Sequence, residues 1–182
     1  MDRDYLDKKI RKISNFPKEG ILFYDITTLF EDGAAFRKVV DELSEFYIDK
    51  KIDKVVGIDA RGFLLASAMA YKLGVGISIV RKKGKLPYKT RMSTYEKEYG
   101  PDIIEMHEDT IRAGEKVVII DDLLATGGTM LATIDLVKQM GGEIISIDFI
   151  INLSFLPGLK KLQEKGYKVN YLIGYDNEDI KK

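Results

Sequence analysis

The stretch from Val117 to Thr129 reads Val-Val-Ile-Ile-Asp-Asp-Leu-Leu-Ala-Thr-Gly-Gly-Thr, and it decides the fold. Four aliphatic residues lead into two adjacent acids, and a small turn with two glycines follows. Beyond Thr129 the apolar residues recur at the spacings of four and three that mark a helix, namely at Met130, Ile134, Val137 and Met140. The pattern predicts a buried strand, a loop and a helix. Open α/β sheets bind ligands at the carboxyl ends of their strands, so we expect a ligand site in this loop.

The turn has the residue types of a phosphate site. Gly127 and Gly128 let a ligand come close to the main chain, and successive N–H groups beside a helix N-terminus attract an anion. Thr126 and Thr129 add hydroxyl donors. The pair Asp121–Asp122 would repel a phosphate, so we expect these acids to face sugar hydroxyls or a Mg²⁺ ion on the same ligand. A sugar phosphate with free vicinal hydroxyls satisfies both ends of the stretch.

Two common nucleotide-binding motifs are missing from this loop. It lacks the Gly-Lys-Ser/Thr of a P-loop and the Gly-x-Gly-x-x-Gly of a dinucleotide site. A bare Thr-Gly-Gly-Thr would be read as an ordinary strand-to-helix turn with a threonine cap. The aliphatic strand and the acid pair before it make the combination much more specific.

Length and composition narrow the class of protein. A chain of 182 residues predicts one domain with a substantial core. The 29 basic and 29 acidic residues cancel, which argues against a dedicated nucleic-acid or membrane-surface binder. With no cysteine and one histidine, His107, zinc-thiolate sites, histidine metal clusters and a cysteine nucleophile are excluded. The N-terminal residues are charged rather than apolar, so we expect a cytoplasmic protein.

Strand and helix patterns alternate along the chain, which predicts an α/β fold with a mainly parallel sheet and right-handed crossovers. The helical spacing of Leu6, Ile10 and Ile13 predicts a short amphipathic helix over residues 3–14, and residues 91–100 read as a flexible hairpin over the site. Besides the helix that begins near Thr129, helices are predicted at 33–49 and 63–73. A last helix is predicted from Ser154 or Pro157 to Gly166. The predicted strands lie at 21–27, 54–58, 77–80, 102–108, 117–120, 144–151 and 168–173.

Two further segments can meet anions at the same end of the sheet. Asp59-Ala60-Arg61-Gly62 is a second strand-to-helix turn, where the alternatives are a helix cap with a surface arginine or an anion site. Residues 81–91 contain six basic residues and no acid. Such a run is usually a solvated face, but here it follows a strand end on the expected ligand side.

Five segments together resemble the type I phosphoribosyltransferases, and in particular their adenine branch. The sequence Asp-Asp-Leu-Leu-Ala-Thr-Gly-Gly-Thr resembles the motif of that family for phosphoribosyl diphosphate (PRPP). The other four segments precede this motif in the chain and come in the order of the family. They read Phe-Pro-x-x-Gly-Ile-x-Phe-x-Asp-Ile-Thr from Phe16, Gly-Ile-Asp-Ala-Arg-Gly-Phe from Gly57, Arg-Lys-Lys-Gly-Lys-Leu-Pro from Arg81, and Tyr-Glu-Lys-Glu-Tyr-Gly from Tyr95. The resemblance implies the type I phosphoribosyltransferase fold, with an N-terminal hood over about residues 1–30 and a flexible loop over about 82–105.

The resemblance also implies a role for each matching residue. Ala125, Thr126, Gly127, Gly128 and Thr129 would bind the 5-phosphate, and Ala60, Arg61, Arg81, Lys82 and Lys85 the pyrophosphate. Adenine would contact Ile21, Phe23, the main chain of Tyr24, and Leu123, while Glu98, Asp121 and Asp122 would be catalytic and Tyr99 would be an aromatic that swings as the loop closes. Mg²⁺ would be held mainly through PRPP, with Asp121 and Asp122 as candidate protein ligands. The peptide between Asp59 and Ala60 would be cis, and the apolar helix 63–73 is a candidate interface of a homodimer.

The implied reaction is purine salvage, in which adenine and PRPP give AMP and pyrophosphate. From the residues alone, Glu96 competes with Glu98 as the acid that acts on the base. The acceptor could instead be hypoxanthine, guanine or xanthine, because the base specificity depends only on the resemblance of residues 16–27. A non-catalytic nucleotide sensor on the same fold is the alternative from another class. The zero net charge and the presence of Glu98 argue against it.

Overall fold

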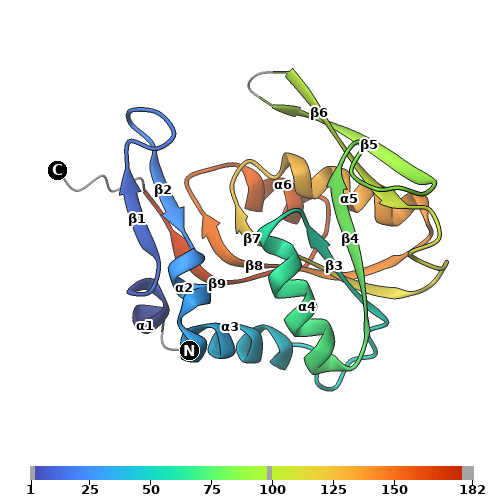
Figure 1. The fold of residues 1–182 in the computed structure, drawn as a ribbon, viewed down its shortest axis with the longest axis horizontal. Coiled ribbons are helices and arrows are strands. Elements are labelled where there is room, and N and C mark those ends of the chain that lie inside the picture. The colour runs from blue at the N-terminus through green and yellow to red at the C-terminus, as the bar shows by residue number, and fades with distance from the viewer. Residues whose placement is uncertain (1–2, 98–99, 178–182) are drawn as a thin grey trace.

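A seven-stranded sheet forms the centre of the computed structural model, which describes residues 3–97 and 100–177 (Figure 1). The strand order is β5-β6-β4-β3-β7-β8-β9. Neighbours from β4 to β9 are parallel, whereas β6 pairs antiparallel with both β4 and β5 and forms a hairpin with β5 at one edge. The predicted α/β class with a mainly parallel sheet is therefore confirmed. The strands are β3 (Lys54–Ile58), β4 (Gly76–Lys82), β5 (Thr90–Lys97), β6 (Gly100–His107), β7 (Lys116–Leu124), β8 (Glu143–Leu153) and β9 (Val169–Tyr175).

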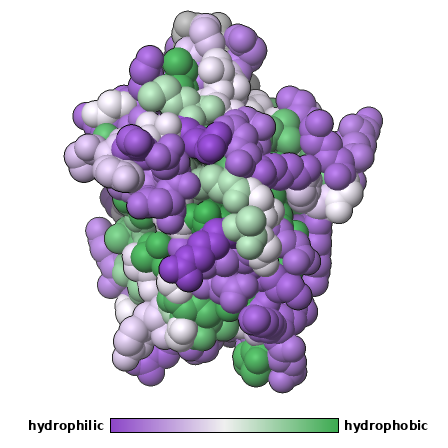
Figure 2. Space-filling view, turned by 90° about the vertical axis from the view of Figure 1, so that its right-hand side faces the viewer, coloured by the Kyte–Doolittle hydropathy of each residue, from purple (hydrophilic) through white to green (hydrophobic). Residues whose placement is uncertain are grey.

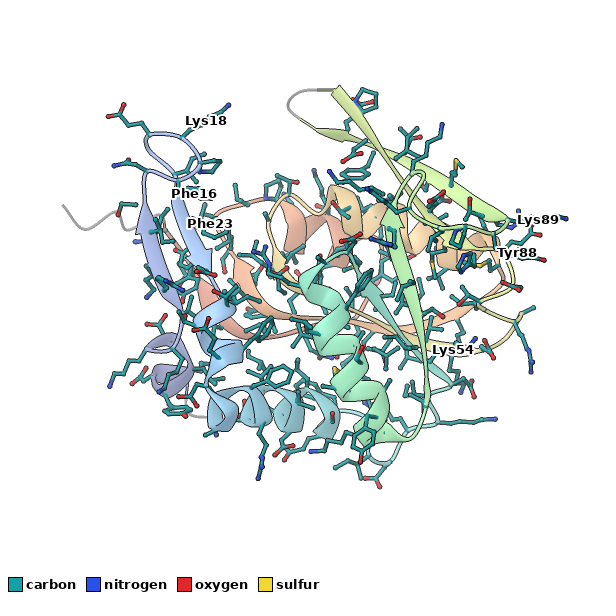
Figure 3. The ribbon with its side chains drawn as sticks, in the orientation of Figure 1. Phe16, Lys18, Phe23, Lys54, Tyr88 and Lys89 are labelled. Carbon is teal, nitrogen blue, oxygen red and sulfur yellow. The ribbon has the colours of Figure 1, made fainter. Side chains whose placement is uncertain are left out.

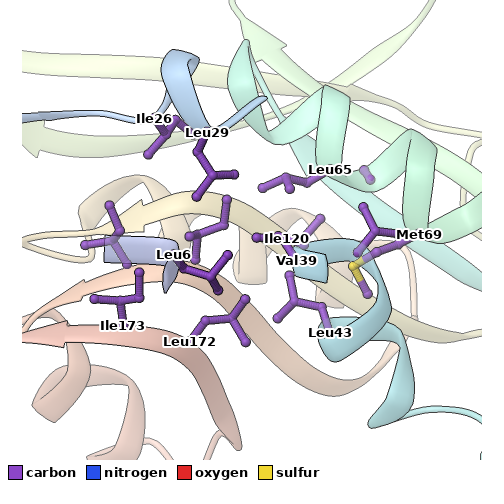
Figure 4. Close-up of a cluster of buried hydrophobic side chains, with 14 of the residues drawn as sticks. Leu6, Ile26, Leu29, Val39, Leu43, Leu65, Met69, Ile120, Leu172 and Ile173 are labelled. Carbon is purple, nitrogen blue, oxygen red and sulfur yellow. The ribbon is translucent and has the colours of Figure 1, made fainter. Parts of the chain in front are cut away.

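Helices cover both faces of this sheet. On one face lie α3 (Gly33–Glu45) and α4 (Arg61–Leu73), and on the other α5 (Gly128–Gln139) and α6 (Gly158–Glu164). Strand β7 sends Val118 and Ile120 into the first core and Val117 and Ile119 into the second. A strand buried on both faces has a continuous apolar run instead of an alternating one. Figure 4 shows the first core, where Ile120 packs among residues of α3 and α4.

The N-terminal elements form the predicted hood: α1 (Arg3–Asp7), β1 (Arg11–Ser14), β2 (Leu22–Asp25) and α2 (Thr27–Glu31). The prediction of one helix over residues 3–14 is wrong, because the chain leaves the helix after Asp7 and pairs as β1 with β2, with Ile13 opposite Phe23. Leu6 and Ile10 are buried as the helical spacing implies. Strand β2 lies beyond residues 3–14, so the helical spacing within those residues could not reveal its pairing with β1.

Two other predicted boundaries change. The helix predicted over 33–49 ends at Glu45, because Tyr47 turns into the core and donates its hydroxyl to Asp148. Strand β7 continues through Leu124 and pairs with β8 up to Asn152. Asp121 and Asp122 therefore lie at the carboxyl end of the strand, as predicted, and the strand extends beyond them to Leu124.

The strand order creates a crevice between β3 and β7. The chain passes from β3 through α4 to β4 on one side, and later returns to β7 on the other side of β3. The loops after β3 and β7 therefore diverge at the carboxyl edge, which is the binding position in open α/β sheets. In the described part of the chain no helix has the length and apolar character needed to cross a membrane.

Candidate active site

A cavity of about 450 Å³ lies at the carboxyl ends of β3, β4 and β7. A smaller cradle of about 100 Å³ follows the turn after β7 and shares Asp121, Leu123 and Thr129 with the cavity. The structure thus brings the acid pair together with two predicted anion-binding segments. The predicted site residues that line the cavity are Ala60, Arg61, Arg81, Lys82, Asp121, Asp122, Leu123 and Thr129.

The cradle has the geometry of an anion site. All five predicted phosphate residues, Ala125–Thr129, line it. Gly127 has a φ of 80°, which favours glycine, and a Cβ there would lie 3.1 Å from the Cα of Gly158. Because α5 begins at Gly128, its first N–H groups lack acceptors within the helix. A helix N-terminus with free N–H groups suits one phosphate.

Helix α6 supports this cradle from outside. The Gly158 N–H donates to the Ala125 carbonyl oxygen (3.0 Å), and Lys161 Nζ donates to the Thr126 carbonyl oxygen (3.2 Å). A Cβ on Gly158 would collide with the Ala125 oxygen and lie 2.8 Å from Leu124 Cδ1. Sequence reasoning missed both residues, because the turn they support lies far away along the chain and Gly158 reads only as part of a predicted helix.

The two acids have different surroundings. Asp122 is only 6% exposed, and its Oδ2 lies 2.7 Å from Arg61 Nε. Among the described residues this oxygen has an ion pair but no aligned hydrogen bond. Burial, followed by the charge of Asp122, raises the pKa of Asp121 well above its usual range. Asp121 therefore ionises less readily than a free carboxyl, because burial and the neighbouring charge of Asp122 both disfavour its charged form.

Arg61 connects the acid pair to the hood. Its guanidinium lies over the ring of Phe23, with 5.9 Å to the ring centroid. Phe16 packs edge-to-face on Phe23 at 5.0 Å between centroids, and Figure 3 shows the two rings in the hood. The loop of Arg61 can approach β7 closely because Gly62 has no side chain, since a Cβ there would lie 3.0 Å from Asp121 Oδ1.

The four predicted adenine contacts have different positions. Leu123 lines the cavity, and Phe23 lies beside Arg61. The side chain of Tyr24 is buried and stacks on Tyr175 at 4.2 Å, so this side chain packs against β9 rather than facing the cavity. Ile21 is 39% exposed and lies outside the cavity lining.

The predicted pyrophosphate residues lie on the β3 and β4 side. Arg81 Nε lies 3.0 Å from Asp59 Oδ2, and Lys82 Nζ lies 3.6 Å from Asp102 Oδ2. Lys85 is exposed and stands outside the cavity lining. The peptide between Asp59 and Ala60 is cis, as the resemblance implies.

The hairpin of β5 and β6 contributes Tyr95 and Ile104 to the cavity lining, and sequence reasoning assigned a role to neither. Tyr95 lines the cavity, and its ring meets the cradle so closely that a Cβ on Gly128 would lie 3.1 Å from Tyr95 Cδ2. Glu98 and Tyr99 fall outside the described residues. Glu96, the competing acid, is exposed on β5.

The acids suit a metal ion that is held mostly by its ligand. Within residues 3–97 and 100–177, no group of three or more His, Cys, Asp or Glu side chains could hold a metal ion. Mg²⁺ requires a nearly octahedral set of oxygens and often takes only one or two carboxylates from the protein. Asp121 and Asp122 can supply that number, with phosphate and hydroxyl oxygens of a ligand as the others.

Comparison with known proteins agrees with this geometry. Residues 27–171 match the family described as phosphoribosyl transferase domain, and the chain belongs to this family. An adenine phosphoribosyltransferase of Clostridium botulinum is 52% identical over 171 residues, which cover 94% of this chain and 98% of the relative. Within the family, the chain belongs to the adenine phosphoribosyltransferases.

Solved structures of the same group have the same fold. The adenine phosphoribosyltransferase of Thermoanaerobacter pseudethanolicus matches with a TM-score of 0.90 at 45% identity, covering 95% of this chain and 99% of that chain. The Saccharomyces cerevisiae enzyme, solved with adenine and an imino-altritol 1,6-bisphosphate, matches with a TM-score of 0.88 at 40% identity, covering 94% and 98%. The fold predicted from the resemblance is therefore confirmed.

Proposed function

We propose that this chain transfers the 5-phosphoribosyl group from PRPP to adenine, giving AMP and pyrophosphate in purine salvage. The observation that carries this proposal is one crevice with an anion cradle, an acid pair and a cationic wall. PRPP has the matching groups, namely a 5-phosphate, two ribose hydroxyls and a pyrophosphate. Membership of the adenine phosphoribosyltransferases supports adenine as the acceptor.

The sugar-phosphate end would lie along β7 and α5. The N–H groups and hydroxyls of Ala125–Thr129 donate to the 5-phosphate, and the N-terminus of α5 adds favourable dipole charge. Asp121 and Asp122 accept hydrogen bonds from the ribose hydroxyls. The unfilled bonding capacity of Asp122 Oδ2 supports this role, because a buried carboxylate oxygen is destabilising until it is hydrogen-bonded.

The pyrophosphate end would lie against the β3 and β4 side. Arg61, Arg81, Lys82 and Lys85, together with the backbone of Ala60, neutralise the leaving group. In the ligand-free chain, Arg61 pairs with Asp122 and Arg81 with Asp59, yet the two arginine side chains are 40% and 34% exposed. The pair of Arg81 with Asp59 is partly exposed on both sides and contributes only about 0–1 kcal/mol, so Arg81 can turn toward pyrophosphate at little cost. If Arg61 turns away, the buried Asp122 carboxylate loses its ion pair, so ribose hydroxyls or Mg²⁺ would have to take that place.

The base would bind between the hood and the end of β7. Phe23 and Leu123 offer apolar contacts to a planar ring, and the main chains of Ile21 and Tyr24 can read its edge. Glu98 would accept the imidazole proton of the base as a general base. Positive charge develops on the sugar as pyrophosphate leaves, and the neighbouring carboxylates stabilise it. Loop closure excludes water, which would otherwise hydrolyse PRPP.

Mg²⁺ is the cofactor that fits this arrangement. PRPP oxygens would supply most of its ligands, with Asp121 and Asp122 as the protein's contribution. When bound, the ion neutralises phosphate charge and favours departure of pyrophosphate.

A homodimer completes the proposal. Leu64 and Tyr71 on α4 and Ile77 on β4 are 52%, 91% and 40% exposed. Leu64, Ala68 and Tyr71 follow helical spacing, so they form one apolar stripe along α4. Large exposed apolar side chains that gather in this way mark interaction surfaces.

The proposal is tested by measuring PRPP-dependent release of pyrophosphate with adenine, hypoxanthine, guanine and xanthine in parallel. We expect turnover with adenine and little with the other three bases. Turnover with another purine alone would change the acceptor, and release with none of the four would refute the enzyme assignment.

A further inference from the structure

One buried acid lies beneath the basic run of residues 81–91. Glu105 on β6 is only 2% exposed and stands opposite Arg81 of β4 and Met92 of β5. The mechanism above gives this carboxylate no role. A buried carboxylate is costly unless its oxygens are hydrogen-bonded, so its partners show what it does.

The groups that donate hydrogen bonds to the Glu105 carboxylate, within the described part of the chain, belong to the basic run. Its Oε1 accepts from the backbone N–H groups of Lys85 (3.0 Å) and Leu86 (3.1 Å), and its Oε2 accepts from the Thr90 hydroxyl (3.1 Å). Burial acts to raise the pKa of Glu105, but these hydrogen bonds outweigh it and lower the pKa below its usual value. The side chain is therefore an ionised carboxylate whose oxygens accept hydrogen bonds from the basic run.

The backbone of Lys85 is held from both sides. Its N–H donates to Glu105, and its carbonyl oxygen accepts from Arg81 at 3.2 Å. The same arginine pairs with Asp59 at 3.0 Å, next to the cis peptide at Ala60. Glu105 thereby joins the basic run to the loop after β3.

Such a restraint has a physical purpose in this segment. Lys82, Lys83 and Lys85 are exposed neighbours of one charge, and their repulsion favours an extended loop. Figure 3 shows Tyr88 and Lys89 at the outer end of the hairpin, and Figure 2 shows that this face of the molecule is mainly hydrophilic. Residues 82–85 and 87–89 are all exposed, so little apolar burial holds the run in place. Because the Glu105 carboxylate is buried and saturated by N–H and O–H donors, it organises the lysines without competing for them.

We propose that Glu105 is a positioning residue for pyrophosphate: it folds the basic run so that Lys82 and Lys85 face the leaving group of PRPP. The inference rests on the proposed function of the run. It extends that function to a residue that neither touches the ligand nor carries the positive charge.

The test measures binding of Mg²⁺-pyrophosphate and of AMP to the full chain by calorimetry, for the wild type and four variants. Glu105→Ala should weaken pyrophosphate binding about tenfold, since it removes hydrogen bonds to a charged group, while AMP binding stays within about twofold because AMP does not use this loop. Glu105→Gln should keep most of the affinity, because its amide oxygen can accept both N–H groups and its NH₂ can donate to Thr90. Lys85→Met tests the loop itself and should weaken pyrophosphate binding only.

Glu115→Ala is the matched control. Glu115 Oε2 also accepts a hydrogen bond from a backbone N–H, that of Arg112 at 2.8 Å. However, Glu115 lies just before the amino end of β7, whereas the cavity lies at the carboxyl end of that strand. This variant should bind both ligands like the wild type. If Glu105→Ala does not fold, Thr90→Val removes one of the three hydrogen bonds with little change of shape and should weaken pyrophosphate binding about threefold.

The possible outcomes distinguish the positioning role of Glu105 from the role of the basic run in binding pyrophosphate. Weak pyrophosphate binding by Lys85→Met but not by Glu105→Ala would overturn the role of Glu105 alone. Normal binding by both variants would remove the basic run from the pyrophosphate site. Equal weakening of AMP and pyrophosphate by Glu105→Ala, together with a lower melting temperature, would show general destabilisation and would also overturn the positioning role.

Discussion

Replacement of Asp148 by asparagine should remove a pH-dependent loss of stability. Asp148 on β8 is completely buried and accepts hydrogen bonds from Tyr47 Oη (2.6 Å), Asn170 Nδ2 (2.9 Å) and Ser146 Oγ (3.2 Å). Burial raises the pKa of this carboxyl to about 6, although the three hydrogen bonds oppose the shift. None of these four side chains lines the cavity or the phosphate cradle, so we expect the substitution to change stability rather than ligand binding.

Proton linkage gives the direction and the magnitude of the change in stability that Asp148 causes as the pH rises. Between the ordinary pKa of 3.8 and about 6, the folded chain binds a proton at Asp148 that the unfolded chain has lost. Stability therefore falls as the pH rises through this window and stays at the lower level above it. At about 1.4 kcal/mol per pKa unit, the full loss is about 3 kcal/mol, and about 2 kcal/mol of it occurs between roughly pH 4.5 and 7.

Urea unfolding followed by circular dichroism suits this measurement, because the chain has no tryptophan. Between pH 4.5 and 7, the free energy of unfolding of Asp148→Asn should rise relative to the wild type by about 2 kcal/mol. Asp49→Asn, at an exposed position, serves as the control and should parallel the wild type. Parallel curves for Asp148→Asn and the wild type would refute the reasoning, whatever the absolute stabilities.

Two further predictions concern the ligand site. Gly158→Ala should weaken AMP binding at least about tenfold, because the new Cβ collides with the Ala125 carbonyl oxygen and must displace the phosphate turn. Gly33→Ala, where a Cβ meets open space, should leave AMP binding unchanged, and equal affinity of the two variants would contradict the supporting role of α6. Arg61→Met should raise the KM for PRPP at least about tenfold, and because it leaves the buried Asp122 carboxylate without its partner it should also lower the free energy of unfolding by about 1–3 kcal/mol. An unchanged KM would remove Arg61 from the pyrophosphate site.

The sequence by itself determined the class of fold and most of the ligand chemistry. Aliphatic runs and helical spacings are local, so they located nearly all the strands of the sheet and the helices α3, α4 and α5. The turns at Asp59–Gly62 and Ala125–Thr129 were equally readable, because glycine, threonine and adjacent acids express their chemistry within a few residues. The order of the motifs also identified the family that the comparisons then confirmed.

Only the tertiary structure decided how these parts meet. The pairing of β1 with β2 replaced a helix that local spacing favoured. Gly158 against the phosphate turn and Glu105 beneath the basic run carried no local signal, since each depends on a segment distant in sequence. The pairing of Arg61 with Asp122 likewise arises because β3 and β7 are neighbours in the sheet. Residue types and periodicity determine elements and chemistry, whereas burial and partner choice depend on packing between elements far apart in the chain.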